Sequence, residues 1–242
     1  MAPTILWFRR NLRLDDNAAL QEAMAIGQPI LPVYIVDELD IGGASRWWLH
    51  HSLASLATRI EALEGSLVLA NGDPAAVLAN LANEHGATRI FTTRRLEPAA
   101  RQQEHRLRQL LGADDALVLA EDALLRKPES VSTQTGNAYK VFTPFYRAAS
   151  AMGEPATPGR APAEINWFDD TVTSLELDEL ALLPTTPDWA AGLRDYWKVG
   201  EDAAHRRIEA MAAKVGGYAD GRDLPAEDLT SGLSPHLHFG EV

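Results

Sequence analysis

The segment Thr4-Ile-Leu-Trp-Phe-Arg-Arg-Asn-Leu-Arg-Leu-Asp-Asp-Asn17 decides the fold, because it joins a short apolar run to a run of charges. Thr4–Phe8 has the near-continuous apolar character of a strand that is buried on both faces of a sheet. Three arginines and two aspartates follow at once. In a doubly wound sheet, this place is the ligand crevice at the C-terminal ends of the strands. The charges therefore indicate either a binding site or a salt-bridged loop that holds the first helix.

Apolar runs alternate with amphipathic stretches through residues 1–150. This alternation predicts an α/β domain with a doubly wound, parallel, five-stranded sheet of Rossmann-like layout. The expected strands are Thr4–Phe8, Ile30–Val36, Ser66–Ala70, Arg89–Thr92 and Ala116–Ala120.

Four helices are expected between these strands, each with recognisable start and stop signals. The first begins at Asp15 or Asp16 and ends before Gly27, and the second runs from Ser45 to Gly65. The third begins at Asp73-Pro74 and ends at Gly86, and the fourth runs from Pro98 to Gly112.

Residues 151–199 differ in composition, and they predict a long interdomain connector. Five prolines and scattered acidic residues make the segment irregular, while Trp167, Phe168, Trp189 and Trp197 within it favour packing against the folded body. A helix is expected from Gly200 to Val215, with Ala204, Ile208, Met211 and Val215 on one face. The residues from Gly200 onward are too few to close a core. We therefore expect residues 200–242 to be the truncated beginning of an all-α domain in a longer protein.

Bulk composition excludes several classes of protein. The 242 residues are 46% hydrophobic and 23% charged, which is ordinary for a soluble globular protein. The net charge of −12 argues against a broad nucleic-acid surface. There are no cysteines, no signal peptide and no run long enough to span a membrane. A cytoplasmic monomer without membrane contact is therefore expected.

Common catalytic motifs are absent from the sequence. The pairs His50-His51 and His236/His238 have poor spacing for a shared ion, so we expect no metal site. No Gly-x-Gly-x-x-Gly follows the first strand, and there is neither a phosphate-loop motif nor a nucleophile elbow.

The chain closes on Thr230-Ser-Gly-Leu-Ser-Pro-His-Leu-His-Phe-Gly-Glu-Val242. Ser234 is the expected N-cap of a helix, with Pro235 at the first helical position. The hydroxyl groups before this helix predict either an anion site or an ordinary capped helix. Separately, the aromatic composition of Tyr139–Tyr146 is typical of a strand or loop packed under a domain interface.

Four motifs together resemble the photolyase/cryptochrome family, and most of all its class I DNA photolyases. They are Trp7–Asn17, Tyr139-Lys-Val-Phe-Thr-Pro-Phe145, Tyr218-x-x-x-Arg222-Asp223-x-Pro225 and Thr230-Ser-Gly-Leu-Ser-Pro-His-Leu237. The similarity runs in order from Thr4 to the last residue. It implies an α/β domain, a connector and the beginning of a helical FAD-binding domain, which agrees with the organisation read from the residues.

The resemblance implies a light-driven DNA repair enzyme, which splits cyclobutane pyrimidine dimers with an electron from reduced FAD. It assigns FAD contacts to Tyr218, Thr230, Ser231, Gly232, Leu233 and Ser234 and a DNA contact to Arg222, whose alternative is an ion pair with a neighbouring carboxylate. The catalytic residues are expected beyond Val242, so the chain alone is expected to be inactive. A cryptochrome-type photoreceptor without repair activity is the alternative.

The resemblance also implies a second, light-harvesting chromophore in the α/β domain. A carboxylate and an amide expected for a folate would follow Glu97, where this chain has Pro98-Ala99-Ala100. The choice among a deazaflavin, FMN, a folate and no antenna stays open, with folate disfavoured.

Overall fold

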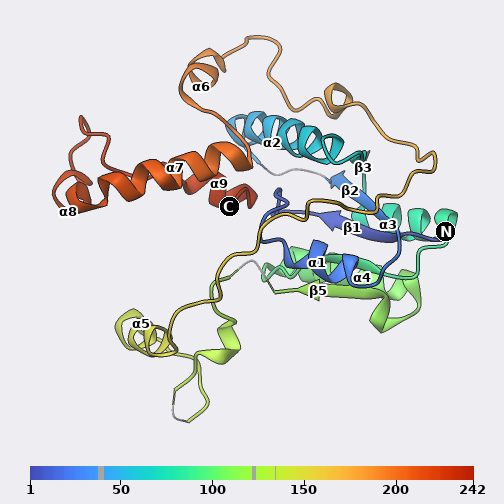
Figure 1. The fold of residues 1–242 in the computed structure, drawn as a ribbon, viewed down its shortest axis with the longest axis horizontal. Coiled ribbons are helices and arrows are strands. Elements are labelled where there is room, and N and C mark those ends of the chain that lie inside the picture. Colours follow the sequence, from blue (N-terminus) through green and yellow to red (C-terminus); the bar gives the residue numbers. More distant parts are fainter. Residues whose placement is uncertain (38–40, 122–123, 134) are drawn as a thin grey trace.

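The computed structural model describes residues 1–37, 41–121, 124–133 and 135–242. Within them, five strands form one sheet in the order β3-β2-β1-β4-β5, and all neighbouring strands are parallel (Figure 1). The strands are β1 (Thr4–Phe8), β2 (Ile30–Val36), β3 (Val68–Asn71), β4 (Ile90–Thr93) and β5 (Leu117–Ala120). The predicted doubly wound sheet is confirmed, and each predicted strand overlaps an observed one.

Helices cover both faces of the sheet: α1 (Ala18–Met24), α2 (Gly43–Glu61), α3 (Pro74–His85) and α4 (Pro98–Leu111). Alternate residues of β1 point to opposite faces, as the period of a strand requires. Leu6 and Phe8 pack with α1 and α2, whereas Ile5 and Trp7 pack with α3 and α4. The two hydrophobic cores therefore share the central strand.

Local signals placed the ends of α3 and α4 correctly. Asp73 caps α3 by accepting a hydrogen bond from the Ala76 N–H at 3.2 Å, and Gly86 and Gly112 end the two helices with positive φ. The start of α1 was predicted wrongly. Its N-cap is Asn17, which accepts from the Leu20 N–H at 3.0 Å.

The predicted cap residues of α1 instead bind a distant segment. The side chains of Asp15 and Asp16 accept hydrogen bonds from the N–H groups of Ala161 and Gly159, at 2.8 and 2.9 Å. Contacts with the connector thus displaced the local preference for aspartate at a cap.

The connector lies against the sheet domain, as its aromatic residues predicted. Trp167 is buried, and Ile30 at the start of β2 exchanges backbone hydrogen bonds with Asn166 and Phe168. The connector then forms α6 (Ala191–Tyr196) beside α2 before the chain enters α7. The connector therefore packs on the domain from Gly159 onward, whereas residues 151–158 are exposed.

Residues 139–146 were predicted as a strand or loop, and this is wrong. Residues Phe142–Ala151 form the helix α5, which stands apart from the sheet (Figure 1). Pro144 is tolerated because it lies in the first turn, where backbone N–H groups need no intrahelical partner. The side chains of Phe142 and Tyr146 are 73% and 59% exposed, so they are not packed under an interface in this structure.

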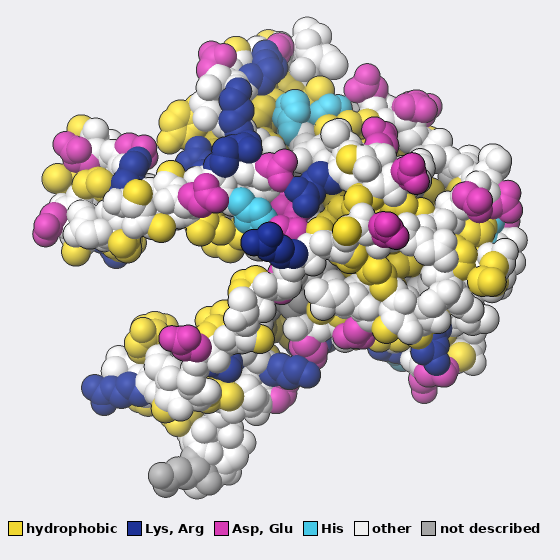
Figure 2. Space-filling model, viewed as in Figure 1, with side chains coloured by type: hydrophobic (Ala, Val, Ile, Leu, Met, Phe, Trp, Pro, Cys, Tyr) yellow, Lys and Arg dark blue, Asp and Glu magenta, His cyan; other side chains and the backbone are white. Residues whose placement is uncertain are grey.

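The final part of the chain holds α7 (Glu201–Lys214), α8 (Tyr218–Gly221) and α9 (Ser234–Phe239). Only the first turn of α7 packs on the body, where Glu201, Ala203 and Ala204 are buried. The predicted apolar face of α7 is mostly exposed, since Val215 is 62% accessible and the helix projects outward. Figure 2 shows hydrophobic side chains on both projecting parts, the α7–α8 region and the α5 region. No helix of the described residues is long and apolar enough to cross a membrane.

Candidate functional site

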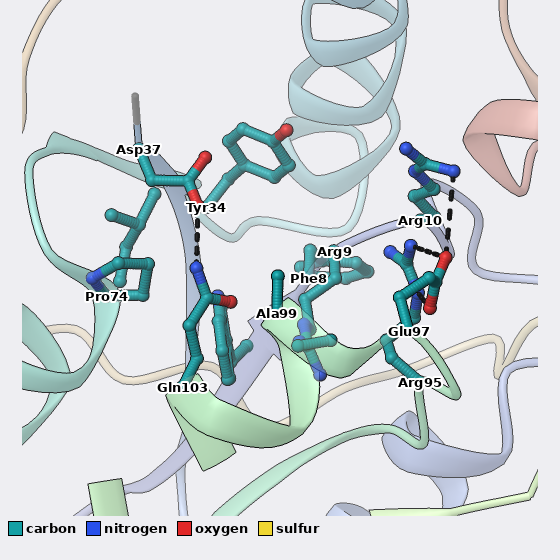
Figure 3. A pocket seen from close by; sticks show the side chains of 13 residues that line it. Phe8, Arg9, Arg10, Tyr34, Asp37, Pro74, Arg95, Glu97, Ala99 and Gln103 are labelled. Atoms are coloured by element: carbon teal, nitrogen blue, oxygen red, sulfur yellow. Dashed lines mark hydrogen bonds and ion pairs between the residues drawn. The ribbon is translucent and has the colours of Figure 1, made fainter. Parts of the chain in front are cut away.

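A cavity of about 270 Å³ lies at the C-terminal ends of β1 and β2, beside the point where the strand order reverses (Figure 3). Doubly wound sheets bind ligands at this place. We call it the strand-end pocket. Its walls are formed by Trp7, Phe8, Arg9, Arg10, Tyr34, Ile35, Asp37, Pro74, Arg95, Glu97, Ala99, Ala100 and Gln103.

The strand-end pocket combines an aromatic wall with paired charges. The hydrogen bond from Arg95 lowers the pKa of Glu97 to about 2, so this carboxylate stays ionised. Burial raises the pKa of Tyr34, and the charge of Asp37 adds to the rise, so the phenol stays neutral. These walls offer both hydrogen-bond donors and acceptors to a planar polar ligand.

Pro98-Ala99-Ala100 was predicted to disfavour a folate, because this segment lacks a carboxylate and an amide. The structure agrees with this only in part. Ala99 and Ala100 do line the pocket, without polar side chains. A carboxylate and an amide nevertheless meet here, because Gln103 Nε2 donates to Asp37 Oδ2 at 2.7 Å. The identity of an antenna chromophore therefore stays a prediction.

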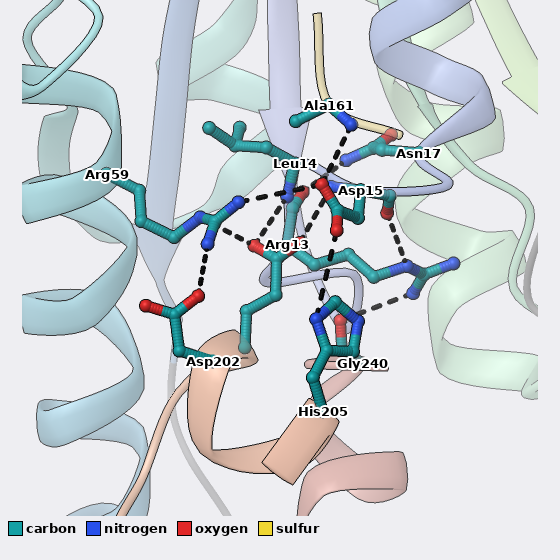
Figure 4. A network of polar contacts seen from close by, with 10 residues as sticks. Arg13, Leu14, Asp15, Asn17, Arg59, Ala161, Asp202, His205 and Gly240 are labelled. Atoms are coloured by element: carbon teal, nitrogen blue, oxygen red, sulfur yellow. Dashed lines mark hydrogen bonds and ion pairs between the residues drawn. The ribbon is translucent and has the colours of Figure 1, made fainter. Parts of the chain in front are cut away.

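The loop Arg9–Asn17, which we call the first loop, follows β1, and its buried charged groups are paired with other groups of the protein. Arg9 Nη1 donates to Glu104 Oε1 at 2.6 Å, and both side chains are buried. Arg13 donates to three backbone carbonyls, among them that of Gly240 at 3.2 Å (Figure 4). Of the two sequence interpretations, the salt-bridged loop describes most of this segment, and Arg9 and Arg10 also line the strand-end pocket.

Glu201, at the start of α7, fixes the middle of the first loop. Its side chain is 1% exposed and accepts hydrogen bonds from the N–H groups of Leu14 and Asp15, at 2.9 and 2.7 Å. Arg59 Nε lies 2.9 Å from its Oε2. Burial raises the pKa of Glu201, and the two backbone bonds oppose the rise.

Asp15, Glu201 and His205 also form a compact group, with one possible ligand atom from each within 4.8 Å of the others. Both oxygens of Glu201 already accept backbone hydrogen bonds, and the guanidinium of Arg59 supplies positive charge. The cluster is thus accounted for without an ion. Sequence spacing could not reveal it, because its members come from different elements.

The first loop also holds α9. The Leu12 N–H donates to the Phe239 carbonyl at 3.2 Å. Gly240 has φ of 68°, and a Cβ at this position would overlap the Arg10 carbonyl oxygen. Only glycine allows this close approach of two backbones.

The segment Thr230–Ser234, which we call the hydroxyl loop, contrasts with this. Its one internal bond runs from the Leu233 N–H to Ser231 Oγ at 3.3 Å. Among the described residues, the N–H groups of Thr230, Ser231 and Gly232 find no acceptor, and the hydroxyls of Thr230 and Ser234 make no hydrogen bond. These donors lie together at a half-exposed surface.

Ser234 was predicted to be the N-cap of α9, and this is wrong. The cap is Leu233, no side chain caps the helix, and Pro235 occupies the second position. The helix begins one residue earlier because Leu233 already has helical backbone angles. The hydroxyl of Ser234 consequently has no partner among the residues that the structure describes.

Tyr218 begins α8, Arg222 is the C-cap of that helix, and the two side chains contact each other. The Arg222 Cζ lies 5.5 Å from the centre of the Tyr218 ring, and Arg222 Nε lies 3.4 Å from Asp223 Oδ1. The neighbouring carboxylate that the sequence offered as an alternative partner is thus engaged. Within the described residues, no hydrogen bond or ring contact joins Tyr218 to the hydroxyl loop.

A family model described as DNA photolyase matches residues 4–163 of the chain. The chain therefore belongs to the DNA photolyase family. The deoxyribodipyrimidine photo-lyase of Agrobacterium fabrum is 41% identical over 246 residues, which cover 100% of this chain and 51% of the relative. Cryptochrome-1 of Arabidopsis thaliana is 31% identical over 258 residues, covering 99% of this chain and 36% of the relative.

Solved structures agree with this membership. A bacterial class III photolyase from Agrobacterium tumefaciens superposes with a TM-score of 0.94 at 40% identity, covering 100% of this chain and 51% of that one. An archaeal photolyase from Sulfolobus tokodaii, described with two FAD molecules, has a TM-score of 0.76 at 22% identity. It covers 99% of this chain and 52% of that one, and it shows the fold alone. The chain spans about half the length of the photolyases it matches.

Proposed function

We propose that the chain is the N-terminal part of a photolyase that uses blue or near-UV light to repair cyclobutane pyrimidine dimers in DNA. The 41% identity to a deoxyribodipyrimidine photo-lyase over the whole chain supports this reaction. The four sequence motifs most resembled those of class I DNA photolyases. The likeness at a TM-score of 0.94 is to a class III enzyme, so we propose class III-like architecture.

The residues of the hydroxyl loop fit the phosphates and ribitol of FAD. Thr230–Ser234 contains three backbone N–H groups and two hydroxyls that are unpaired among the described residues, and phosphate oxygens are the acceptors such donors bind best. This set of free donors is the observation that carries the proposal. We also assign Tyr218, at the start of α8, to the flavin, and the rest of the pocket would come from further residues.

When bound, reduced FAD supplies the electron that opens the cyclobutane ring and takes it back afterwards. The part of this chain is to bind and orient that group. We assign Arg222 to the phosphate backbone of the damaged strand, because its side chain is half-exposed at the end of α8. The Asp223 carboxylate beside it reduces this attraction.

The strand-end pocket is the proposed antenna site. Its place at the strand-order reversal and its mixed polar and aromatic walls suit the ring system of a second chromophore. Its volume of about 270 Å³ accommodates one ring system better than a complete dinucleotide.

Flavin binding and dimer repair by the isolated chain test the proposal. We expect weak FAD binding and no loss of dimers from UV-irradiated DNA under blue light. If the isolated chain bound one FAD per molecule and repaired dimers with turnover, the proposal that it is only one part of the enzyme would be wrong. No FAD binding at any concentration would argue against the hydroxyl loop as a flavin site.

A chimera tests the reaction directly. This chain would replace the corresponding half of the Agrobacterium fabrum photolyase, to which it is similar over its full length. Blue-light repair by the chimera, lost in a Thr230→Ala/Ser234→Ala variant, would support the enzyme assignment. A chimera that holds FAD with no repair would favour the cryptochrome-type alternative, to which the 31% identity to cryptochrome-1 also points.

A further inference from the structure

Arg207, on the outer part of α7, lies directly against the hydroxyl loop. Its Cζ is 4.5 Å from the centre of the Trp197 ring and 5.8 Å from that of Tyr196. Gly232 lies on the other side, and a Cβ added there would overlap Arg207 Nη1. The guanidinium is thus held between an aromatic wall and the backbone of Gly232.

This guanidinium has no acceptor in the described part of the chain. Among the described residues, Arg207 makes no hydrogen bond and no ion pair, whereas Arg59, Arg94, Arg95 and Arg194 are all engaged with carboxylates. Asp228 is the carboxylate that affects it electrostatically, and Lys214 already pairs with Asp228 at 2.9 Å. Stacking on Trp197 also fixes the plane of the guanidinium while leaving its N–H edges free.

We propose that Arg207 is a phosphate-binding residue of the hydroxyl loop, with the diphosphate of a dinucleotide as its ligand. The role rests on the proposed FAD site and adds the positive charge that the loop itself lacks. Gly232, whose N–H group has no acceptor among the described residues, lies directly against Arg207 Nη1, so a diphosphate bound at the loop would be within reach of the guanidinium. Gly232 is needed because any larger residue would displace the guanidinium.

Binding of three probes to the chain separates this role from a structural one. FAD carries the diphosphate, riboflavin lacks it, and inorganic pyrophosphate presents it alone. Equilibrium dialysis would measure binding of the flavins, and isothermal titration calorimetry would measure binding of pyrophosphate. We expect Arg207→Gln to weaken FAD and pyrophosphate binding about tenfold to a hundredfold, because a charge-assisted hydrogen bond is lost. Riboflavin binding should not change.

Arg206→Gln is the matched control. It removes the same charge one residue away on the same helix, from a side chain that faces a different cavity beside Lys198. It should leave FAD affinity within about twofold of the wild-type value, since exposed charges act weakly at a distance. Arg207→Lys keeps the charge and should restore part of the lost affinity, which also guards against a folding defect in Arg207→Gln.

Each outcome decides between the two proposals. Unchanged FAD affinity in Arg207→Gln, or an equal loss in Arg206→Gln, would overturn the role of Arg207 while the FAD site stands. An equal loss of riboflavin binding would make Arg207 structural and overturn the role. If the chain binds pyrophosphate through Arg207 but does not bind FAD, the phosphate-binding role of Arg207 stands and the proposed FAD site is overturned. A chain that binds neither probe would overturn both.

Discussion

The first loop and the hydroxyl loop are both polar, and each leads into a short helix. In the first loop, the buried polar groups are hydrogen-bonded to other groups of the protein. Arg9 donates to Glu104, Arg13 donates to backbone carbonyls, and two backbone N–H groups donate to Glu201. In the hydroxyl loop, three N–H groups and two hydroxyls have no partner among the described residues.

The difference teaches that polar composition alone does not identify a binding loop. A buried polar group must be paired, and in the first loop the pairing joins the sheet domain to α7 and α9. Donors left free at a surface can be satisfied by a ligand instead. Substitutions in the first loop should therefore act on stability, and those in the hydroxyl loop on ligand affinity.

The largest effect is expected from Glu201→Ala. The substitution leaves two backbone N–H groups and Arg59 without their buried acceptor, and it should lower the free energy of unfolding by about 3–5 kcal/mol. Urea denaturation followed by circular dichroism would measure this. Asp202→Ala is the control, because Asp202 pairs with the same Arg59 but is 65% exposed, and it should cost less than about 0.5 kcal/mol. Equal losses for the two variants would contradict the role of Glu201.

Gly240→Ala should rank second. Both Gly240 and Gly112 have left-handed backbone angles, with φ of 68° and 70°. At Gly112 nothing lies within 4 Å of an added Cβ, so Gly112→Ala should cost only about 1 kcal/mol. At Gly240 the Cβ would also overlap the Arg10 carbonyl, and a total loss of about 2–4 kcal/mol is expected. Thermal unfolding of the pair tests whether the first loop and α9 are truly in contact.

Substitutions in the hydroxyl loop should show the opposite pattern. Thr230→Ala and Ser234→Ala remove hydroxyls that bind nothing in the described part of the chain, so the free energy of unfolding should change by less than about 0.5 kcal/mol. Each should weaken FAD binding about fivefold, the value of a neutral hydrogen bond near 1 kcal/mol. Thr230→Ser keeps the hydroxyl and should bind FAD as the wild type does. A stability loss without an affinity loss would make this loop resemble the first loop.

The smallest expected effect is the loss of stability at low pH that comes from protonation of Glu97. Arg95 lowers the pKa of Glu97 to about 2 from a usual 4.5, so the ionised carboxylate stabilises the fold above pH 4.5. This contribution is lost as the pH falls toward 2. Because Glu97 is 50% exposed, it should amount to less than about 1 kcal/mol. In Arg95→Gln, an NMR titration should find the pKa of Glu97 closer to 4.5, and an unchanged value would contradict the pairing.

The sequence correctly predicted the features of the fold that depend on interactions between neighbouring residues. The strands and the ends of α3 and α4 follow from apolar runs and from Asp73, Gly86 and Gly112, whose partners lie within a few residues. The start of α1 was mispredicted because Asp15 and Asp16 bind N–H groups 146 and 143 residues away. No local pattern carries that information.

The candidate sites divide in the same way. The residues of the hydroxyl loop were assigned through a motif, and the structure adds that their donors are free. Arg207 was missed, because its importance depends on Trp197 and Gly232, which a linear reading does not place beside it. The apolar face expected on α7 was also wrong, since periodicity shows an amphipathic helix but not whether another element covers it.

The contacts of the first loop have a consequence for synthesis on the ribosome. Arg13 and the carbonyl of Gly240 are separated by 227 residues, yet they share a hydrogen bond. At about 5–20 residues per second, the loop waits roughly 10–45 s for this partner after its own translation. The central strand is thus among the first segments made, while the loop that follows it is completed only after 227 further residues have been translated. A nascent-chain proteolysis experiment should find the first loop cleavable until α9 has emerged.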